Sequence, residues 1–325
     1  MGWGRGTVER GRRIFSGLAG RGSMIKRILV LLLLAGTLSA SEVLQVASLN
    51  PIATDLARQI GGDAVVVIEL MKPGQDPHVY APSPSDLKAA EDAVLILAMG
   101  KGLETYLDGL RETLPQGQAI VEIGKMIPSL RIDAEKALFA CCPTHSHGAA
   151  DPHWWHSVRN MKRAAKLLAD AFAKAQPPQA DAFRKRAKDY ESRLDSLDAW
   201  AKQEIGRIPL THRHLTTAHA AFNYFCEDFR FKPVPILGLS TLDQPRPGQM
   251  RMVMDTLRQE NVEVVFPENG ANPGVLETVA KEAGIRVGGV LLAGSPLPEA
   301  PTFEAMFRHN VETLVAALAP SGEGK

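Results

Sequence analysis

The chain has 325 residues, of which 45% are hydrophobic and 22% are charged, and this composition excludes a disordered or fibrous protein. The length suffices for one large domain or for two modest lobes, each with its own core. Residues 1–40 contain seven of the 37 basic residues and one of the 36 acidic ones, so the remainder has a net charge of −5, which argues against nucleic acid as a partner.

The N-terminal region predicts export from the cytoplasm. A basic start at Met24 is followed by the apolar run 28–34 and by small residues up to Ser41. This order is typical of a secretory signal peptide, and the run is too short to span a bilayer comfortably. We therefore predict a signal peptide in residues 1–40, in which residues 1–23 are an over-called start or a genuine basic extension. No cysteine follows the small residues, so we expect a periplasmic or secreted protein without a lipid anchor.

Strands and helices alternate over the next part of the chain. Residues 42–50 predict a strand, with Asn50 as the cap of a helix that starts at Pro51. The β-branched run 64–70 is typical of a buried parallel strand. Two more apolar runs, 93–100 and 119–124, flank a helical segment at 103–114. The alternation predicts an α/β lobe with a mostly parallel sheet, which we assign to residues 41–178.

A long helical region follows. Residues 161–208 have no strand signal and predict two helices, separated at Pro177 and Pro178. The second helix has an apolar stripe of Phe183, Tyr190, Leu194, Leu197 and Ile205. Its length exceeds the usual globular range, so we assign residues 179–208 to a helix that links two lobes.

The alternation then resumes in a second lobe, assigned to residues 209–320. Four apolar runs each precede a helical segment: 214–218, 233–239, 262–266 and 286–292. The predicted fold class is therefore α/β, with two lobes of parallel-type sheets joined by a long backbone helix.

Four candidate metal ligands, two in each lobe, lie at or beyond the ends of predicted strands: His78, His153, His219 and Glu268. Open α/β sheets bind ligands at the carboxyl ends of their strands, so these side chains are expected to face one cleft. Three imidazoles and a carboxylate suit a borderline divalent cation, Zn²⁺ first. Asp76 and Asp151, each two residues ahead of a histidine, are expected to orient the imidazole rings.

Two other functions remain open at this point. One is a secreted zinc-dependent hydrolase that uses the same three histidines with Glu268 as general base, although the chain has no HExxH motif and no nucleophile elbow. The other is a binding protein for a metal chelate such as haem or a siderophore. The segment Cys141–His147 is either an auxiliary zinc-collecting loop or a plain solvated loop.

Five stretches in order resemble the solute-binding proteins of zinc and manganese ABC transporters: GQDPHVYAPSPSDL, DPHWW, TTAHAAFNYF, VVFPE and FRHNVETLVAAL. The resemblance is to cluster A-I, of the periplasmic zinc-binding type, and covers about residues 43–318. It implies that His78, His153 and His219 are metal ligands. It further implies that the chain is a monomeric binding protein and not an enzyme. Its cargo would then be Zn²⁺, with Mn²⁺ as the alternative, and its partner the membrane permease.

One departure from the family pattern concerns the fourth ligand. Members of the family commonly have an aspartate at the position of Gly294. The resemblance therefore leaves Glu268, His156 or a water for the fourth position, and we favour Glu268 or water. The expected function is capture of the metal between the lobes and its delivery to the permease.

Overall fold

The computed structural model describes residues 1–2, 43–130, 150–243 and 247–320. Nearly all of the predicted signal peptide, and the whole segment Cys141–His147, lie outside these residues. The chain divides after residue 42 into two units, and the second unit contains both sheets. Within the described part of the chain, no helix has the length and apolar character that a membrane span requires.

The first sheet has four parallel strands in the order β2-β1-β3-β4. Its strands are β1 (Leu44–Ser48), β2 (Val65–Glu69), β3 (Leu95–Ala98) and β4 (Ala119–Glu122), and its helices are α2 (Pro51–Gly61), α3 (Pro84–Ala89) and α4 (Leu107–Thr113). Asn50 caps α2 as predicted, because its side-chain oxygen accepts a hydrogen bond of 2.8 Å from the backbone N–H of Ile52.

The second sheet repeats this topology, in the order β6-β5-β7-β8. Its strands are β5 (His214–Thr217), β6 (Lys232–Pro233), β7 (Val264–Phe266) and β8 (Arg286–Val287), and its helices are α7 (Asn223–Phe229), α8 (Pro247–Gln259), α9 (Gly274–Ala283) and α10 (Phe303–Leu318). All pairings between these strands are parallel. The two parallel sheets confirm the predicted fold class.

Two strands of the second sheet are shorter than predicted. In the run 233–239, Pro233 and Pro235 have no N–H to donate, so the regular ladder is interrupted. Beyond β6, Val234 and Ile236 still donate to carbonyls of β5 at 2.9 and 3.0 Å, and Leu237 donates to the carbonyl of Ala218 at 2.9 Å. In the run 286–292, Gly288 and Gly289 follow β8 directly. Their lack of side chains weakens a strand interior.

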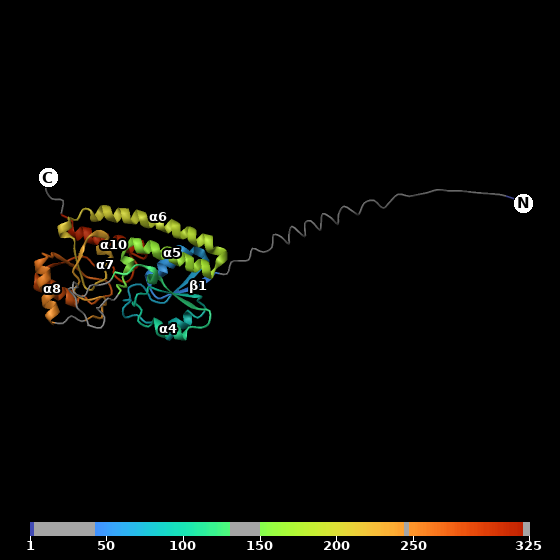
Figure 1. Ribbon diagram of the computed structural model, residues 1–325, viewed down its shortest axis with the longest axis horizontal. Coiled ribbons are helices and arrows are strands. Elements are labelled where there is room, and N and C mark those ends of the chain that lie inside the picture. Colours follow the sequence, from blue (N-terminus) through green and yellow to red (C-terminus); the bar gives the residue numbers. More distant parts are fainter. Residues whose placement is uncertain (3–42, 131–149, 244–246, 321–325) are drawn as a thin grey trace. The chain divides into compact units, whose positions relative to one another are not determined.

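Two long helices, α5 (Val158–Ala175) and α6 (Ala180–Ile205), pack against each other, and α6 also contacts α2 and α10 (Figure 1). With 26 residues, α6 corresponds to the predicted linking helix. Its buried positions are Phe183, Ala187, Tyr190, Leu194, Leu197, Ala201 and Ile205, and they include all five residues of the predicted stripe. The exact lobe boundaries remain a prediction.

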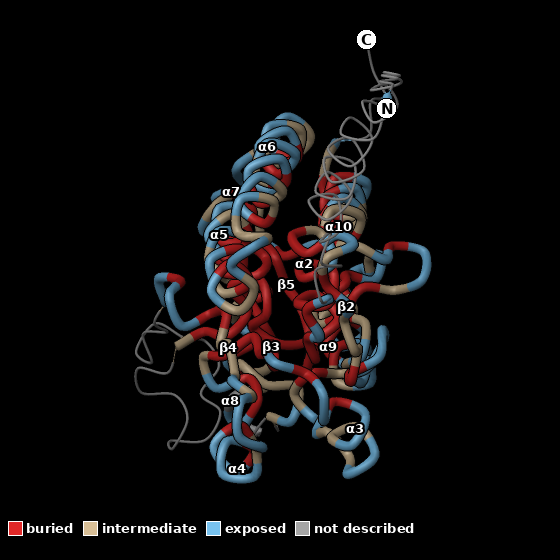
Figure 2. Tube along the Cα trace, turned by 90° about the vertical axis from the view of Figure 1, so that its right-hand side faces the viewer, coloured by how far each residue is buried: buried red, intermediate tan, exposed pale blue. Residues whose placement is uncertain are grey.

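The largest hydrophobic core is shared by both lobes. It joins buried residues of the first sheet, such as Val46, to residues of the second, such as Val264, and to the stripe of α6. Alternate residues of the strands, such as Ala47 and Val265, face two smaller cores on the opposite sides of the sheets. Figure 2 shows buried residues between the helices and the strands, and exposed ones on the outer faces of α5 and α6. Both faces of each sheet are covered, as parallel strands require.

Candidate metal centre

Three histidines from distant parts of the sequence converge on one point. His78 lies in the loop between β2 and α3, His153 comes directly before the 3-10 turn Trp154–His156, and His219 lies two residues after β5. The Nε2 atom of His153 is 3.2 Å from that of His78 and 3.3 Å from that of His219. One nitrogen of each ring lies within 4.8 Å of the others.

These separations fit a metal ion better than hydrogen bonds between rings. Ligand nitrogens at about 2.0–2.1 Å from a tetrahedral Zn²⁺ lie about 3.3 Å apart. A hydrogen bond between two imidazoles would have a similar length, but it leaves the third ring unexplained. His153 and His219 are buried, and His78 is partly buried. The arrangement therefore offers three nitrogen ligands on one side of a common centre.

Asp151 orients His153. Its Oδ1 accepts bonds of 2.9 Å from both the backbone N–H and Nδ1 of His153. With the proton held at Nδ1, the lone pair of Nε2 points into the cluster. Burial, and the charge of His219, lower the pKa of His153 well below its usual range. This ring is therefore neutral and ready to ligate.

Glu268 lies beside His219 and not among the converging nitrogens. Its Oε1 accepts a bond of 3.1 Å from the backbone N–H of His219, and its Oε2 contacts His219 Nδ1. Among the described residues, the close set of ligand atoms contains the three histidines and not Glu268. This placement differs from the expected direct ligation, because both carboxylate oxygens already contact His219. Burial lowers the pKa of His219, but the charge of Glu268 and its hydrogen bond outweigh that effect and raise it.

His78 is held by its backbone and not by its ring. Asp76 Oδ1 accepts a bond of 2.9 Å from the backbone N–H of His78, and Asp76 Oδ2 accepts one of 2.6 Å from Thr241 of the other lobe. Asp76 therefore fixes the loop, whereas the sequence suggested that it orients the ring. Burial and the neighbouring His153 and His219 lower the pKa of His78 to about 2, so this ring is also neutral.

The aromatic residues after His153 fasten the site to its surroundings. Trp154 donates to the carbonyl of Met99 at 3.0 Å. Trp155 and His156 both donate to the carbonyl of Ala293, at 2.9 and 2.8 Å. His156 is therefore a structural residue that joins the lobes, and it leaves the position of a fourth ligand to another group.

Gly294 has no room for a side chain. A Cβ atom at this position would lie 2.6 Å from Cδ and 2.9 Å from Cγ of Pro77, the residue before His78. The loop that carries His78 thus occupies the space in which a carboxylate from residue 294 would have to lie.

We expect the substitution Gly294→Ala to lower the free energy of unfolding by about 1–3 kcal/mol, the usual cost of overpacking. It should also weaken metal binding, because a displaced Pro77 carries His78 with it. Urea denaturation and zinc titration measure the two effects. Gly109→Ala is the matched control, because a Cβ at Gly109 meets nothing within 4 Å. A G294A protein as stable as the wild type would contradict the steric argument.

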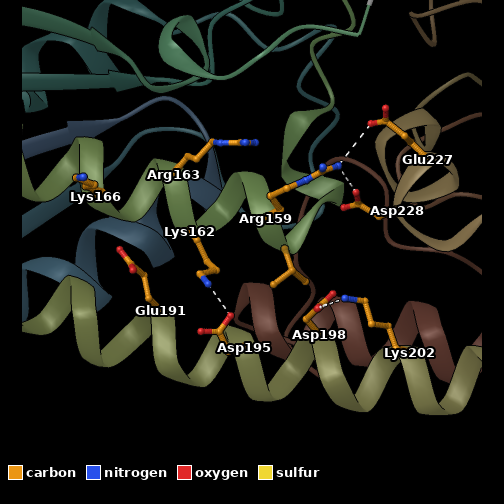
Figure 3. A pocket seen from close by; sticks show the side chains of 11 residues that line it. Arg159, Lys162, Arg163, Lys166, Glu191, Asp195, Asp198, Lys202, Glu227 and Asp228 are labelled. Atoms are coloured by element: carbon orange, nitrogen blue, oxygen red, sulfur yellow. Dashed lines mark hydrogen bonds and ion pairs between the residues drawn. The ribbon is translucent and has the colours of Figure 1, made fainter.

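A groove of about 660 Å³ lies elsewhere, between α5, α6 and α7 (Figure 3). None of the three converging histidines lines it. Most of its charged side chains pair with each other, as in the ion pairs Arg159–Asp228 and Lys162–Asp195. Ion pairs at a surface are solvated and contribute little to stability. We therefore interpret this groove as a solvent-exposed surface between helices and not as the functional site.

Sequence reasoning missed one residue of the site. Asn223, the first residue of α7, donates from its amide to Asp151 Oδ2 at 2.9 Å. Its position four residues after His219 could have identified it, because a polar residue so close in sequence to a candidate ligand is expected to lie near the same site.

The family model for the periplasmic zinc-uptake complex component A matches residues 46–317. The chain is 34% identical over 288 residues to the manganese-binding lipoprotein MntA of Bacillus subtilis (strain 168), covering 86% of this chain and 91% of that protein. It is 31% identical over 267 residues to the iron-binding protein YfeA of Yersinia pestis, covering 81% and 82%. Among solved structures, the periplasmic zinc-binding protein TroA from Treponema pallidum matches with a TM-score of 0.76 and 27% identity, covering 86% of this chain and all of that one. These three relatives are named for different metals: manganese, iron and zinc.

Proposed function

The chain belongs to the family of the periplasmic zinc-uptake complex component A, and from this premise we propose that it captures Zn²⁺ between its two lobes and delivers it to the membrane permease of an ABC transporter. The observation that carries the proposal is the convergence of three imidazole nitrogens from both lobes within 4.8 Å.

Like its relatives, the chain is by family membership a metal-binding, solute-binding component of an ABC transporter. It is not an enzyme. The hydrolase alternative, with Glu268 as general base, has no support among them. The geometry also disfavours it, because both oxygens of Glu268 contact His219.

The choice of Zn²⁺ rests on the chemistry of the donors. Imidazole suits Zn²⁺, whereas Mn²⁺ favours carboxylate, carbonyl and water oxygens. We propose His78, His153 and His219 as the ligands and a water as the fourth. The carboxylates of Asp151 and Glu268 then lie behind the ligands, in contact with Nδ1 of His153 and His219, where they orient the rings and offset the positive charge of the metal ion.

We also propose that the chain acts as a monomer outside the cytoplasm, after cleavage of the signal peptide. Relatives such as MntA are named lipoproteins. This sequence has three cysteines, none before Cys141, so we propose that the chain lacks the lipid anchor that a cysteine after the signal would carry. No nucleic acid is required for this function.

Titration of the purified, metal-free protein with free ZnCl₂ and MnCl₂, in competition with a chelator of known affinity, tests the proposal. We expect one ion per chain and an affinity for Zn²⁺ at least about tenfold higher than for Mn²⁺, in line with the Irving–Williams order and the nitrogen donors. Failure of the protein to bind either free ion would contradict capture and would favour a chelate such as haem. Tighter binding of Mn²⁺ would contradict the choice of zinc.

A further inference from the structure

The segment after β5 carries a metal-ligand candidate and, four residues later, a second functional group. His219 lies at its start and Asn223 is the first residue of α7. Both belong to the C-terminal lobe, yet the amide of Asn223 reaches into the N-terminal lobe, where Asp151 Oδ2 accepts it at 2.9 Å. The amide also donates to the carbonyl of Ala220 at 3.2 Å, which ties it to its own turn.

Asp151 is fully buried and each of its polar atoms has a task. Oδ1 takes the backbone and ring N–H groups of His153, while Oδ2 takes Asn223. Its backbone carbonyl accepts a bond of 3.1 Å from the hydroxyl of Tyr224, the neighbour of Asn223 on α7. Two consecutive residues of the C-terminal lobe therefore hold the residue that orients His153.

We propose that Asn223 is a positioning residue for metal capture, which acts through Asp151 on the ring of His153. The inference rests on the proposed function. With Oδ2 held by the amide, the carboxylate cannot rotate about its Cβ–Cγ bond without losing a buried hydrogen bond, so Oδ1 stays aligned with Nδ1 of His153. The Nδ1–H tautomer is thereby fixed, and with it the direction of the Nε2 lone pair.

The same contact couples ligands from opposite lobes. His219 and Asn223 move together because they share one short segment, and Asn223 holds the partner of His153. His153 is therefore fully prepared for the ion only when the C-terminal lobe, with His219, is in contact. Hydrogen bonds within the protein therefore set the positions of His153 and His219 relative to each other, and the metal ion alone does not have to do so.

The test compares the zinc affinity of Asn223→Ala with that of the wild type. We expect a loss of about tenfold or more, the usual effect of removing a group that supports a metal ligand. Asn223→Leu, which keeps the branched shape of the side chain without its hydrogen-bonding groups, covers the case in which alanine impairs folding. The matched control is Asp228→Ala, which removes another contact of α7 with the N-terminal lobe, to Ser157 at 2.5 Å, but leaves Asp151 untouched.

Two readouts separate positioning from a general loosening of the lobes. In an Asp151→Ala background the Asn223 substitution should have no further effect, because the acceptor of its hydrogen bond is gone. In the metal-free protein, ¹H–¹⁵N spectra of the imidazoles should show one Nδ1–H tautomer for His153 in the wild type and a mixture of tautomers in the variants.

Three affinity results would each overturn the proposal: an N223A affinity within twofold of the wild type, the same loss in the Asp151→Ala background, or an equal loss in Asp228→Ala. An unchanged His153 spectrum in N223A also overturns it. Because that spectrum is recorded without metal, it tests the positioning role independently of metal binding. Absence of zinc binding in the wild type would instead refute the proposed function.

Discussion

The substitution His219→Ala is expected to weaken Zn²⁺ binding by about a thousandfold. Protein zinc sites of several ligands bind with roughly 10–16 kcal/mol, so one ligand of three accounts for about 4 kcal/mol, or three powers of ten. His219 is the converging histidine of the C-terminal lobe, and without it both remaining nitrogens come from the N-terminal lobe. Competition with a chelator of known zinc affinity measures the loss.

His212→Ala serves as the matched control for this experiment, because His212 is exposed and lies two residues before β5, outside the cluster. Its affinity for zinc should equal that of the wild type. A loss of less than tenfold in His219→Ala would mean that the C-terminal lobe contributes no direct ligand, and capture between the lobes would then be wrong.

Zinc affinity is also expected to fall about tenfold for each pH unit below the pKa of His219, because one proton must leave a ligand before the metal binds. Burial keeps His78 and His153 neutral, with the pKa of His78 at about 2. His219 is the exception, since Glu268 raises its pKa above the usual value of 6.5. The proton therefore competes with the metal at His219, from neutral pH downward, and the slope corresponds to one proton.

Glu268→Gln tests the cause of this pH dependence. The amide has no charge to stabilise imidazolium, so the pKa of His219 should fall and the decline in affinity should begin at a lower pH than in the wild type. Zinc titrations between pH 5 and 8 follow both proteins. A decline that begins at the same pH in both, or a slope of three protons in the wild type, would contradict the assignment of the proton to His219 and Glu268.

Much of the fold follows from local patterns. The β-branched run 64–70 does form a parallel strand, β2, although β2 lies at the edge of its sheet with Val66 exposed and is not the buried strand that the run predicted. The apolar stripe of α6 recurs every three or four residues, as a helix requires. Because parallel strands end at one edge, the positions of His78 and His219 beyond their strands already point to a common site. The extent of the weak strands β6 and β8 was harder to predict, since proline and glycine interrupt them.

The division of roles within the site could not be predicted in the same way. A sequence shows that Glu268 follows a strand, but not that its oxygens meet His219 from the side away from the cluster. Nor does it show that Gly294 packs against Pro77, or that Asn223 reaches the other lobe. These contacts join residues far apart in the chain, and only the packing of the two lobes determines them.

The most direct test of the central claim is a crystal structure of the zinc-loaded protein, with anomalous diffraction recorded at the zinc absorption edge. We predict one strong anomalous peak at about 2.0–2.1 Å from the Nε2 atoms of His78, His153 and His219. A peak bound by other residues, or one that leaves any of these three nitrogens out of bonding distance, would contradict the account.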